Sequence, residues 1–264
     1  MPLTSGLKEH RILVTAASQG IGYGVAQAFL EEGARVVINS SNEQRIESAR
    51  AKLASFGEVY AVAADLSEKS GIEKIVSKTS ELLGGIDALA YSTGSPARGT
   101  IMEKRYEEWE EAAKLLTISP TYLARKVAEV MIQNNTKGRM VLSSSSAIRE
   151  PNPNLALSNV CRIAIYGLVR TLARELGPKG IRVNGIMPGY IKTARIDAIV
   201  GYTAKKKGVS EKQALKDLEA QVPLGRVGST QEIAKSFVFL GSELSSYVSG
   251  AMLPVDGALL RSVG

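Results

Sequence analysis

The sequence predicts an α/β fold, in which one doubly wound parallel β-sheet carries helices on both faces. Three observations lead to this prediction. Short apolar runs alternate with amphipathic helical patterns along the chain, which is the element order of a parallel sheet with helical connections. The first apolar run passes through a glycine-containing turn directly into a helical pattern. The chain has 264 residues and no linker-like segment, so we expect residues 1–264 to form a single domain.

Seven runs have the apolar, β-branched composition of strands that are buried on both faces. They lie at residues 11–14, 35–39, 58–63, 87–91, 139–143, 181–186 and 251–255. Helical spacing connects them at residues 21–32, 43–55, 68–83, 104–133, 159–176 and 231–240. In such a sheet, ligands bind beyond the carboxyl ends of the strands. The residues that follow each strand are therefore the candidates for a binding site.

The turn after the first strand is a candidate anion site. Backbone N–H groups at a helix N-terminus attract anions, and glycines without a Cβ atom allow a pyrophosphate to come close. The residues expected to contribute are Thr15, Ser18, Gln19, Gly20, Ile21 and Gly22. An ordinary turn between a strand and a helix has a similar composition, so this turn alone leaves both interpretations open.

Asn39, Ser40 and Ser41 follow the second strand, where a dinucleotide fold distinguishes between its cofactors. An acidic side chain at this place would bind a free ribose 2′-OH and repel a 2′-phosphate. These three residues include neither an acid nor an arginine, and their hydroxyl and amide groups can bind a phosphate. They favour NADP over NAD, although a polar turn without a ligand would have the same composition.

The turns after the later strands carry side chains that suit the same ligand. Asp65, followed by Leu66, is expected to bind an adenine amino group, to cap the next helix, or both. Small residues after the fourth strand would let a ribose lie against the backbone. The candidates there are Ser92, Thr93 and Gly94, and those after the sixth strand are Pro188, Gly189, Ile191 and Thr193.

Charge and composition exclude several classes of function. The net charge is +7, but basic and acidic residues are interleaved, and the densest basic run, residues 205–207, is typical of a solvated helix face. We therefore expect no nucleic-acid partner, and a small anionic cofactor or substrate can use the positive field. No apolar run is long enough to cross a bilayer, and residues 1–6 lack the features of a signal peptide.

Cys161 is the only cysteine, so the chain cannot form an intrachain disulfide or a cysteine zinc cage. No metal-ligand spacing occurs elsewhere. We therefore expect a cytoplasmic protein that binds neither a metal nor a membrane.

On the basis of these motifs, the chain resembles the short-chain dehydrogenase/reductase family over essentially its whole length. Residues 15–22 are similar to the family's Thr-Gly-x-x-x-Gly-Ile-Gly turn, with Ala16 at a glycine position. Pro188-Gly189, residues 223–228 and Val255-Asp256-Gly257 also fall in the family's order. The likeness is to 3-oxoacyl-carrier-protein reductase-like and glucose-dehydrogenase-like members.

The resemblance implies a Rossmann sheet of strand order 3-2-1-4-5-6-7 and a homotetramer or homodimer. It also implies NAD(P)-dependent interconversion of a secondary alcohol and a ketone on an oxoacyl, sugar or polyol substrate. Residues 194–222 correspond to the family's substrate lid. Their charged, helical pattern predicts a solvated helix pair, and the alternative is a cationic lid over an anionic substrate such as a carrier-bound acyl group.

In this family a serine holds the substrate oxygen, a tyrosine transfers the proton, and a lysine four residues after the tyrosine lowers its pKa. Ser145 matches the serine. Ser158 stands at the tyrosine position, thirteen residues after Ser145, and Arg162 stands at the lysine position. Arg162 can hold ribose hydroxyls or a phosphate but does not release a proton at ordinary pH. Residues 115–119 contain no asparagine, which the resemblance implies there as the support of a proton-relay water.

Tyr91, Tyr190 and Glu150 could supply the proton instead, although a role as a packing or surface residue explains each of them more readily. His10, the only histidine, precedes the first strand and lies at the edge of the sheet opposite the crevice.

We therefore expect an NAD(P)-dependent oxidoreductase with a non-standard proton-transfer site, for which Ser145, Ser158 and Arg162 are the catalytic candidates. The alternative is a catalytically impaired dinucleotide-binding protein that acts as a sensor or an oligomer partner.

Overall fold

The computed structural model describes residues 4–262, and at its centre is a seven-stranded parallel sheet. The strands lie in the order β3-β2-β1-β4-β5-β6-β7, which confirms the predicted fold class and strand order. Their limits differ from the predicted ranges by one or two residues at most. The strands are β1 (Arg11–Val14), β2 (Arg35–Ser40), β3 (Val59–Ala63), β4 (Ala88–Tyr91), β5 (Arg139–Ser143), β6 (Arg182–Pro188) and β7 (Met252–Val255).

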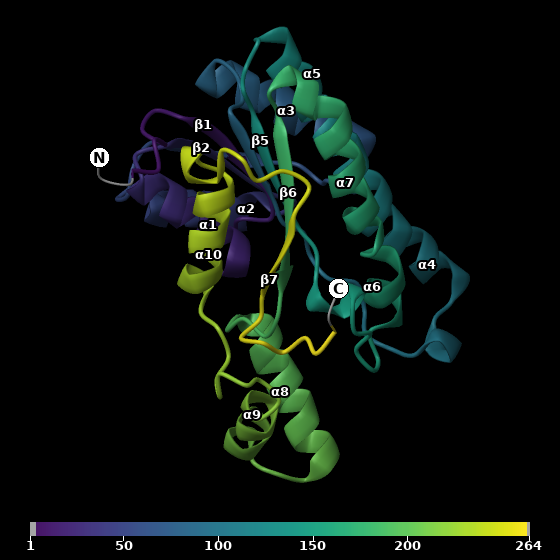
Figure 1. Cartoon of the computed structure of the whole chain (residues 1–264). Helices are drawn as coiled ribbons and strands as arrows, with labels where there is room; N and C mark the ends of the chain where they lie inside the picture. Colours follow the sequence, from purple (N-terminus) through teal and green to yellow (C-terminus); the bar gives the residue numbers. More distant parts are fainter. Residues whose placement is uncertain (1–3, 263–264) are drawn as a thin grey trace.

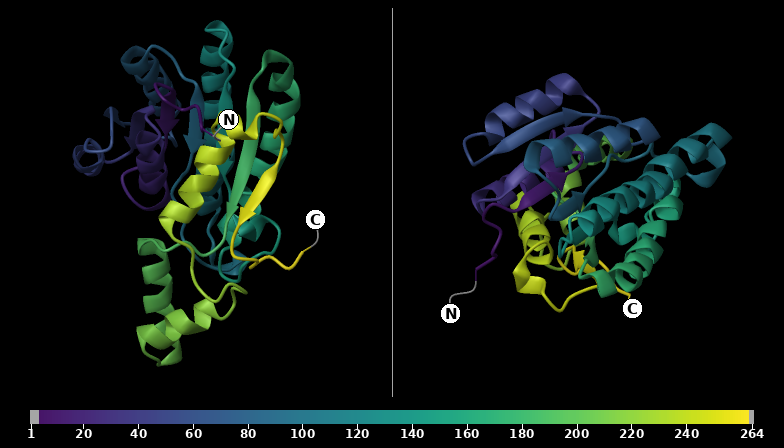
Figure 2. Two further views of the ribbon diagram at one scale, coloured as in Figure 1. Left: turned by 60° about the vertical axis from the view of Figure 1, so that its left-hand side comes forward. Right: turned by 90° about the horizontal axis from the view of Figure 1, so that it is seen from above.

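Helices cover both faces of this sheet (Figures 1 and 2). One face carries α1 (Gly20–Glu31), α2 (Glu43–Leu53) and α10 (Thr230–Leu240), and the other carries α3 (Lys69–Leu83), α5 (Ser119–Gln133) and α7 (Ala164–Leu176). In β1, Ile12 and Val14 lie in the first core and Leu13 in the second. A strand buried on both faces needs an apolar residue at every position, which explains the continuous apolar runs in the sequence.

The long helix predicted over residues 104–133 is divided into three parts. It consists of α4 (Tyr106–Ala113), a π-helical turn (Lys114–Ile118) and α5. Ser119 donates both its backbone N–H and its hydroxyl to the carbonyl of Lys114, with the hydroxyl 2.6 Å from that oxygen. A π-turn inserts a single residue into a helix, so the segments before and after it each keep ordinary helical spacing and together have the pattern of one long helix in the sequence.

The helix predicted between β5 and β6 is also interrupted. It consists of α6 (Ala156–Cys161) and α7, and residues 162–163 form a turn between them. Side chains from outside the helix bind the carbonyls at this turn. The hydroxyl of Thr117 donates to the carbonyl of Cys161 at 3.0 Å, and that of Ser144 donates to the carbonyl of Arg162 at 3.2 Å. Short 3₁₀ turns lie at Ile101–Glu103, Ser146–Ile148, Gly177–Lys179 and Glu243–Ser245.

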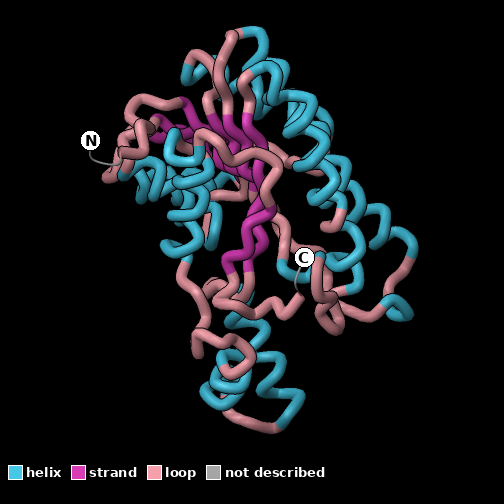
Figure 3. The backbone as a smooth tube through the Cα atoms, in the orientation of Figure 1, coloured by secondary structure: helices cyan, strands magenta, loops and turns pink. Residues whose placement is uncertain are grey.

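The segment over residues 194–222 contains a helix pair, as predicted. α8 (Ala194–Lys207) and α9 (Glu211–Glu219) extend past the carboxyl ends of the strands (Figures 1 and 3). They have a small apolar core of their own, formed by Ile196, Val200, Ala204, Ala214 and Leu218. Within residues 4–262, no helix combines the length and the apolar composition that crossing a membrane requires.

An ion pair between Arg11 and Asp87 joins the start of β1 to the residue before β4. Nη2 of Arg11 lies 2.6 Å from Oδ1 of Asp87, and the backbone N–H of Arg11 donates to Oδ2 at 2.8 Å. Burial alone would raise the pKa of the Asp87 carboxyl, but the hydrogen bonds and charge of Arg11 outweigh it, so this pKa lies below its ordinary value. The ionised carboxylate therefore stabilises the folded state.

We expect Asp87→Asn to lower the free energy of unfolding by about 1–3 kcal/mol at neutral pH, because it leaves Arg11 without its charged partner. Since the folded-state pKa of Asp87 is depressed, its contribution is fully present above the unfolded pKa of about 3.9 and disappears as the pH falls through the folded value. Urea unfolding as a function of pH measures the difference between variant and wild type. Glu47→Gln, in the exposed pair with Arg50, is the control and should change stability by less than about 0.5 kcal/mol. A deficit of Asp87→Asn that does not shrink in acid would contradict this assignment.

Candidate functional site

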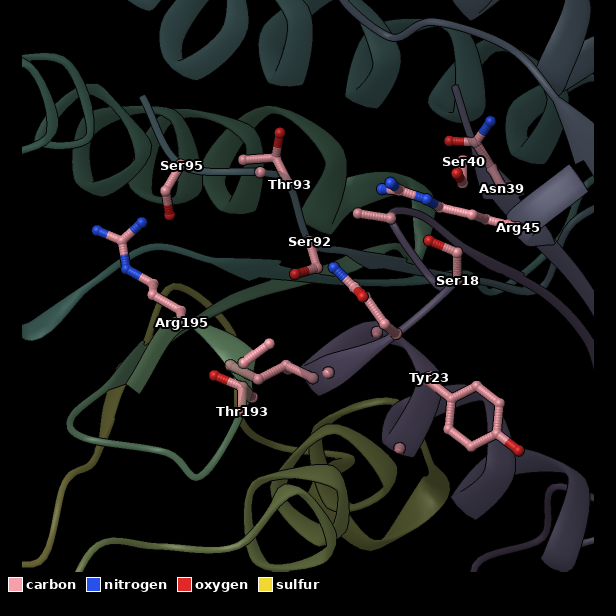
Figure 4. A pocket seen from close by; sticks show the side chains of 18 of the residues that line it. Ser18, Tyr23, Asn39, Ser40, Arg45, Ser92, Thr93, Ser95, Thr193 and Arg195 are labelled. Carbon is pink, nitrogen blue, oxygen red and sulfur yellow. The ribbon is translucent and has the colours of Figure 1, made fainter. Parts of the chain in front are cut away.

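A cleft of about 940 Å³ opens at the carboxyl ends of the strands, and Figure 4 shows its lining side chains. Residues from five separate turns of the chain meet there, as expected for a parallel sheet. The predicted residues that line it are Ser18, Gln19, Gly20, Ile21, Gly22, Asn39, Ser40, Ser41, Asp65, Leu66, Ser92, Thr93, Gly94 and Thr193.

The first turn and the start of α1 have the features of a phosphate site. A Cβ atom on Gly22 would lie 2.4 Å from the carbonyl oxygen of Ala16, so this position accepts only glycine without rearrangement. Gly20 has a φ of +61°. The side chain of Gln19, the N-cap of α1, makes no capping hydrogen bond, so the first N–H groups of the helix remain available to a ligand.

Ala16 adopts a φ of +50°, in the left-handed region that favours glycine. A residue with a Cβ atom is strained there by about 1–2 kcal/mol. The turn thus keeps the backbone path that a glycine would take, although alanine occupies the position.

Thr15 differs from the expectation that it binds the cofactor. Its side chain is fully buried and does not line the cleft. Its hydroxyl donates to the carbonyl of Ser92 at 2.6 Å and accepts from the N–H of the same residue at 2.9 Å. Thr15 therefore positions the turn after β4, because it ties that turn to the end of β1.

At the end of β2, the amide of Asn39 is already in use. It donates to the carbonyls of Val62 and Ala64 at 3.1 and 3.0 Å, so it has no hydrogen left for a phosphate. Arg45, in the first turn of α2, instead extends into the cleft beside Ser40 (Figure 4). Sequence reasoning missed Arg45 because it lies beyond residues 39–41.

One signal could have found Arg45. Asn42 is the N-cap of α2 and accepts from the backbone N–H of Arg45 at 2.8 Å, which places Arg45 in the helical turn nearest to the carboxyl end of β2.

Asp65 lines the cleft, and its Oδ1 accepts from the N–H of Ser67 at 2.8 Å. Helix α3 begins at Lys69, so this bond closes the turn before the helix and does not cap the helix itself.

A smaller pocket of about 150 Å³ adjoins the cleft and shares with it Ile21, Ser92, Thr93, Ser95, Thr193 and Arg195. The three catalytic candidates Ser145, Ser158 and Arg162 all line this pocket. So do Pro188, Gly189 and Ile191, which the sequence assigned to the cofactor site.

Ser158 and Arg162 lie one helical turn apart and are joined by a hydrogen bond. Nε of Arg162 donates to Oγ of Ser158 at 3.1 Å, and Nη2 donates to the carbonyl of Gly94 at 2.8 Å. Both residues are buried. Ser145 is partly exposed, and its Oγ accepts from the N–H of Ala147 at 3.1 Å.

The alternative proton donors have different surroundings. Tyr91 is fully buried, lines neither cavity, and burial raises its pKa to about 12, so it is a poor acid. Glu150 accepts from the backbone N–H groups of Arg261 and Ser262 at 2.6 and 2.8 Å and also lies outside both cavities. Tyr190 does line the pocket, and burial raises its pKa. Of the three, Tyr190 alone can reach a ligand.

Comparison with known proteins identifies the family. Residues 15–259 match the family model described as enoyl-(acyl carrier protein) reductase. Human dehydrogenase/reductase SDR family member 2, mitochondrial, is 33% identical over 97% of this chain and 89% of its own length. This chain belongs to the short-chain dehydrogenase/reductase family.

Other members of this oxidoreductase family are also similar over nine-tenths of their length or more. The glucose 1-dehydrogenase of Gluconobacter oxydans is 31% identical over 94% of this chain and 91% of that protein. The crystal structure of L-sorbose reductase from Gluconobacter frateurii, a complex with NADPH and L-sorbose, matches with a TM-score of 0.94. It is 29% identical and covers 99% of this chain and 100% of that one.

We expect Gly22→Ala to lower the melting temperature and to weaken NADPH binding by about tenfold or more, because the added methyl group displaces the carbonyl of Ala16. Fluorescence titration and thermal unfolding measure the two effects. Gly177→Ala is the matched control, since a Cβ atom there meets nothing within 4 Å. It should leave NADPH affinity unchanged, and equal effects of both variants would refute the phosphate-site assignment.

Proposed function

We propose that this chain is an NAD(P)-dependent oxidoreductase that interconverts a secondary alcohol and a ketone on a sugar- or polyol-type substrate. One observation carries the proposal. The pocket lined by Ser145, Ser158 and Arg162 shares a wall with a cleft large enough for a dinucleotide. The glucose dehydrogenase and L-sorbose reductase activities of similar proteins support the substrate class.

The residues of the cleft fit a dinucleotide. The free N–H groups at the start of α1 would hold its pyrophosphate, and the turn at Ser92–Gly94 would hold the nicotinamide ribose. A nicotinamide bound there supplies or accepts the hydride.

Arg45 with Ser40 and Ser41 supports a preference for NADP over NAD. A guanidinium and two hydroxyls at the end of β2 suit a ribose 2′-phosphate, and Arg45 makes no ion pair within the described residues that would compete for it. The L-sorbose reductase structure was determined with NADPH.

We expect Arg45→Ala to raise the Kd for NADPH by about tenfold and to change the Kd for NADH by less than about twofold, because only NADPH carries the 2′-phosphate. Fluorescence titration with each nucleotide measures the change. Arg50→Ala, on the same helix but outside the cleft, serves as the control and should affect neither. Equal losses for both nucleotides would show that Arg45 does not read the 2′-phosphate.

In the proposed reaction, Ser145 hydrogen-bonds the substrate oxygen and Ser158 transfers the proton. Because the Ser158 oxygen accepts from Arg162, the Ser158 hydroxyl hydrogen is free to be donated into the pocket. In the reductive direction, the substrate carbon gains a hydride while its oxygen gains this proton. The guanidinium stabilises the negative charge that develops on Ser158, although an aliphatic hydroxyl remains a weaker acid than a phenol.

We expect Ser145→Ala to lower kcat by about a hundredfold while NADPH affinity stays within about twofold of the wild type, because Ser145 lies outside the cleft. The assay follows nicotinamide absorbance with a panel of sugar, polyol, oxoacyl and steroid substrates. The alternative, a dinucleotide-binding protein without turnover, gives NADPH binding and no absorbance change with any member of the panel. Absence of NADPH binding would contradict both functions.

A homo-oligomeric state and a cytoplasmic location stay predictions. Ile118 in the π-helical turn, Ile163 in the turn before α7 and Tyr166 in α7 expose apolar surface, which would suit a contact between copies of this chain.

A further inference from the structure

The guanidinium of Arg162 is buried without a counter-charge. The residue is 7% exposed, and within residues 4–262 no carboxylate lies within 4.0 Å of its guanidinium nitrogens. Its two hydrogen-bond partners, the hydroxyl of Ser158 and the carbonyl of Gly94, are neutral. Burial lowers the pKa of Arg162, but an arginine remains protonated in a folded protein. An unpaired buried charge is unfavourable, so this site gains stability when an anion enters.

Part of this guanidinium faces the open space of the small pocket. Nη1 donates to no group of the described chain, whereas Nε and Nη2 do. No buried side-chain nitrogen or oxygen of the described residues lacks a partner, so Nη1 must be accessible from the pocket that Arg162 lines.

The neighbouring side chains cannot supply the negative charge. Tyr91 interacts electrostatically with Arg162, but its pKa of about 12 keeps it neutral at physiological pH. Burial raises the pKa of the Cys161 thiol, so this group is also neutral. Asp256 lies beside the pocket residue Gly189, but its carboxylate is held by the backbone N–H groups of Ala258 and Leu260 at 3.0 and 2.9 Å and lies more than 4.0 Å from the guanidinium nitrogens of Arg162.

A second positive group lies at the same pocket. Arg195 lines both the pocket and the cleft, and its charge acts on Arg162 to lower the pKa of that residue further. Arg195 is in the first turn of α8, whose N-cap Thr193 makes no side-chain capping bond, so the positive end of this helix is open. Figure 4 shows Thr193 and Arg195 at one end of the cleft and Arg45 at the other.

The phosphates of a dinucleotide do not replace the missing anion. They would bind at the start of α1 in the cleft, and Arg162 lines the pocket but not the cleft. Ser145, the expected partner of the substrate oxygen, lines the same pocket as Arg162. The counter-charge therefore has to come with the molecule that occupies this pocket.

We propose that the pocket binds a hydroxy or oxo compound that carries a carboxylate group, with Arg162 and Arg195 as the carboxylate ligands. This inference rests on the proposed function and narrows its substrate class from sugar- or polyol-type compounds in general to those that carry a carboxylate group. A planar guanidinium matches the two oxygens of a carboxylate, with which it can form two parallel hydrogen bonds.

The test compares D-gluconate with D-sorbitol, two six-carbon polyols that differ at one end by a carboxylate in place of a hydroxymethyl group. Binding of each is measured by calorimetry, with and without saturating NADPH. We expect gluconate to bind about tenfold or more tightly than sorbitol, because a charge-assisted hydrogen bond replaces a neutral one. Sorbitol 6-phosphate is the third ligand, and its binding more tightly than gluconate would overturn the carboxylate assignment.

Variants then test which residues cause the preference for gluconate over sorbitol. Arg162→Gln and Arg195→Gln should each reduce the ratio of gluconate to sorbitol affinity by about tenfold. Arg162→Lys should reduce it less, because the positive charge is kept although the two-pronged geometry of the guanidinium is lost. Arg195 is exposed, so its variant keeps the test valid if Arg162→Gln does not fold. Arg226→Gln, which removes a surface arginine paired with Glu232 outside both cavities, is the control and should leave the ratio unchanged.

The two proposals fail in different ways. If the wild type does not bind NADPH, the proposed oxidoreductase function is wrong, and the comparison without NADPH still tests the anion site. If NADPH binds but gluconate binds no better than sorbitol, the carboxylate site alone is wrong.

Discussion

Two hydrogen bonds between the Thr15 hydroxyl and the backbone of Ser92 join the turn after β1 to the turn after β4, and the rest of the site lies around these two turns. Strands β1 and β4 are neighbours in the sheet, and from them the chain proceeds outward in opposite directions, through β2 and β3 on one side and β5 to β7 on the other. The turns after β1 and β4 therefore separate, and a crevice opens between them. The cleft and the smaller pocket both include Ser92, so one contact sets the position of the two cavities relative to each other.

The parts of the fold that could be predicted are those for which burial dictates the residue type. Leu13, between Ile12 and Val14, has to be apolar because both faces of β1 are covered, and the strand is visible from composition alone. The sequence also predicted that the residues after each strand lie at the site, because the carboxyl ends of parallel strands lie at the same edge of a sheet. The π-helical turn had no such signal, because the segments on both sides of it have ordinary helical spacing, and the hydrogen bond from the Ser119 hydroxyl that accompanies the turn cannot be inferred from apolar spacing.

The side chains that were missed belong to the first turns of helices. Arg45 directly precedes Ile46, which is buried in the core under α2. Whether a residue beside the buried stripe points toward the cleft depends on how the helix is rotated on the sheet, and sequence spacing does not specify this. Arg195 was missed for the same reason. The sequence drew attention to Lys205–Lys207, but these residues lie at the far end of α8, about 15 Å along the axis from Arg195.

The π-helical turn at Lys114–Ile118 changes the direction in which the apolar side chains point within one long helical segment. One inserted residue rotates all that follows by about 100° around the helix axis. Before the turn, the segment directs Ala112 toward α6, and after it Leu123 and Val127 face the sheet. In a helix of uniform pitch, one apolar stripe could not face α6 in its first part and the sheet in its second part. One helical segment thus both supports α6, which carries Ser158 of the small pocket, and covers the sheet. The π-helical turn sets the rotation of one part of the segment relative to the other.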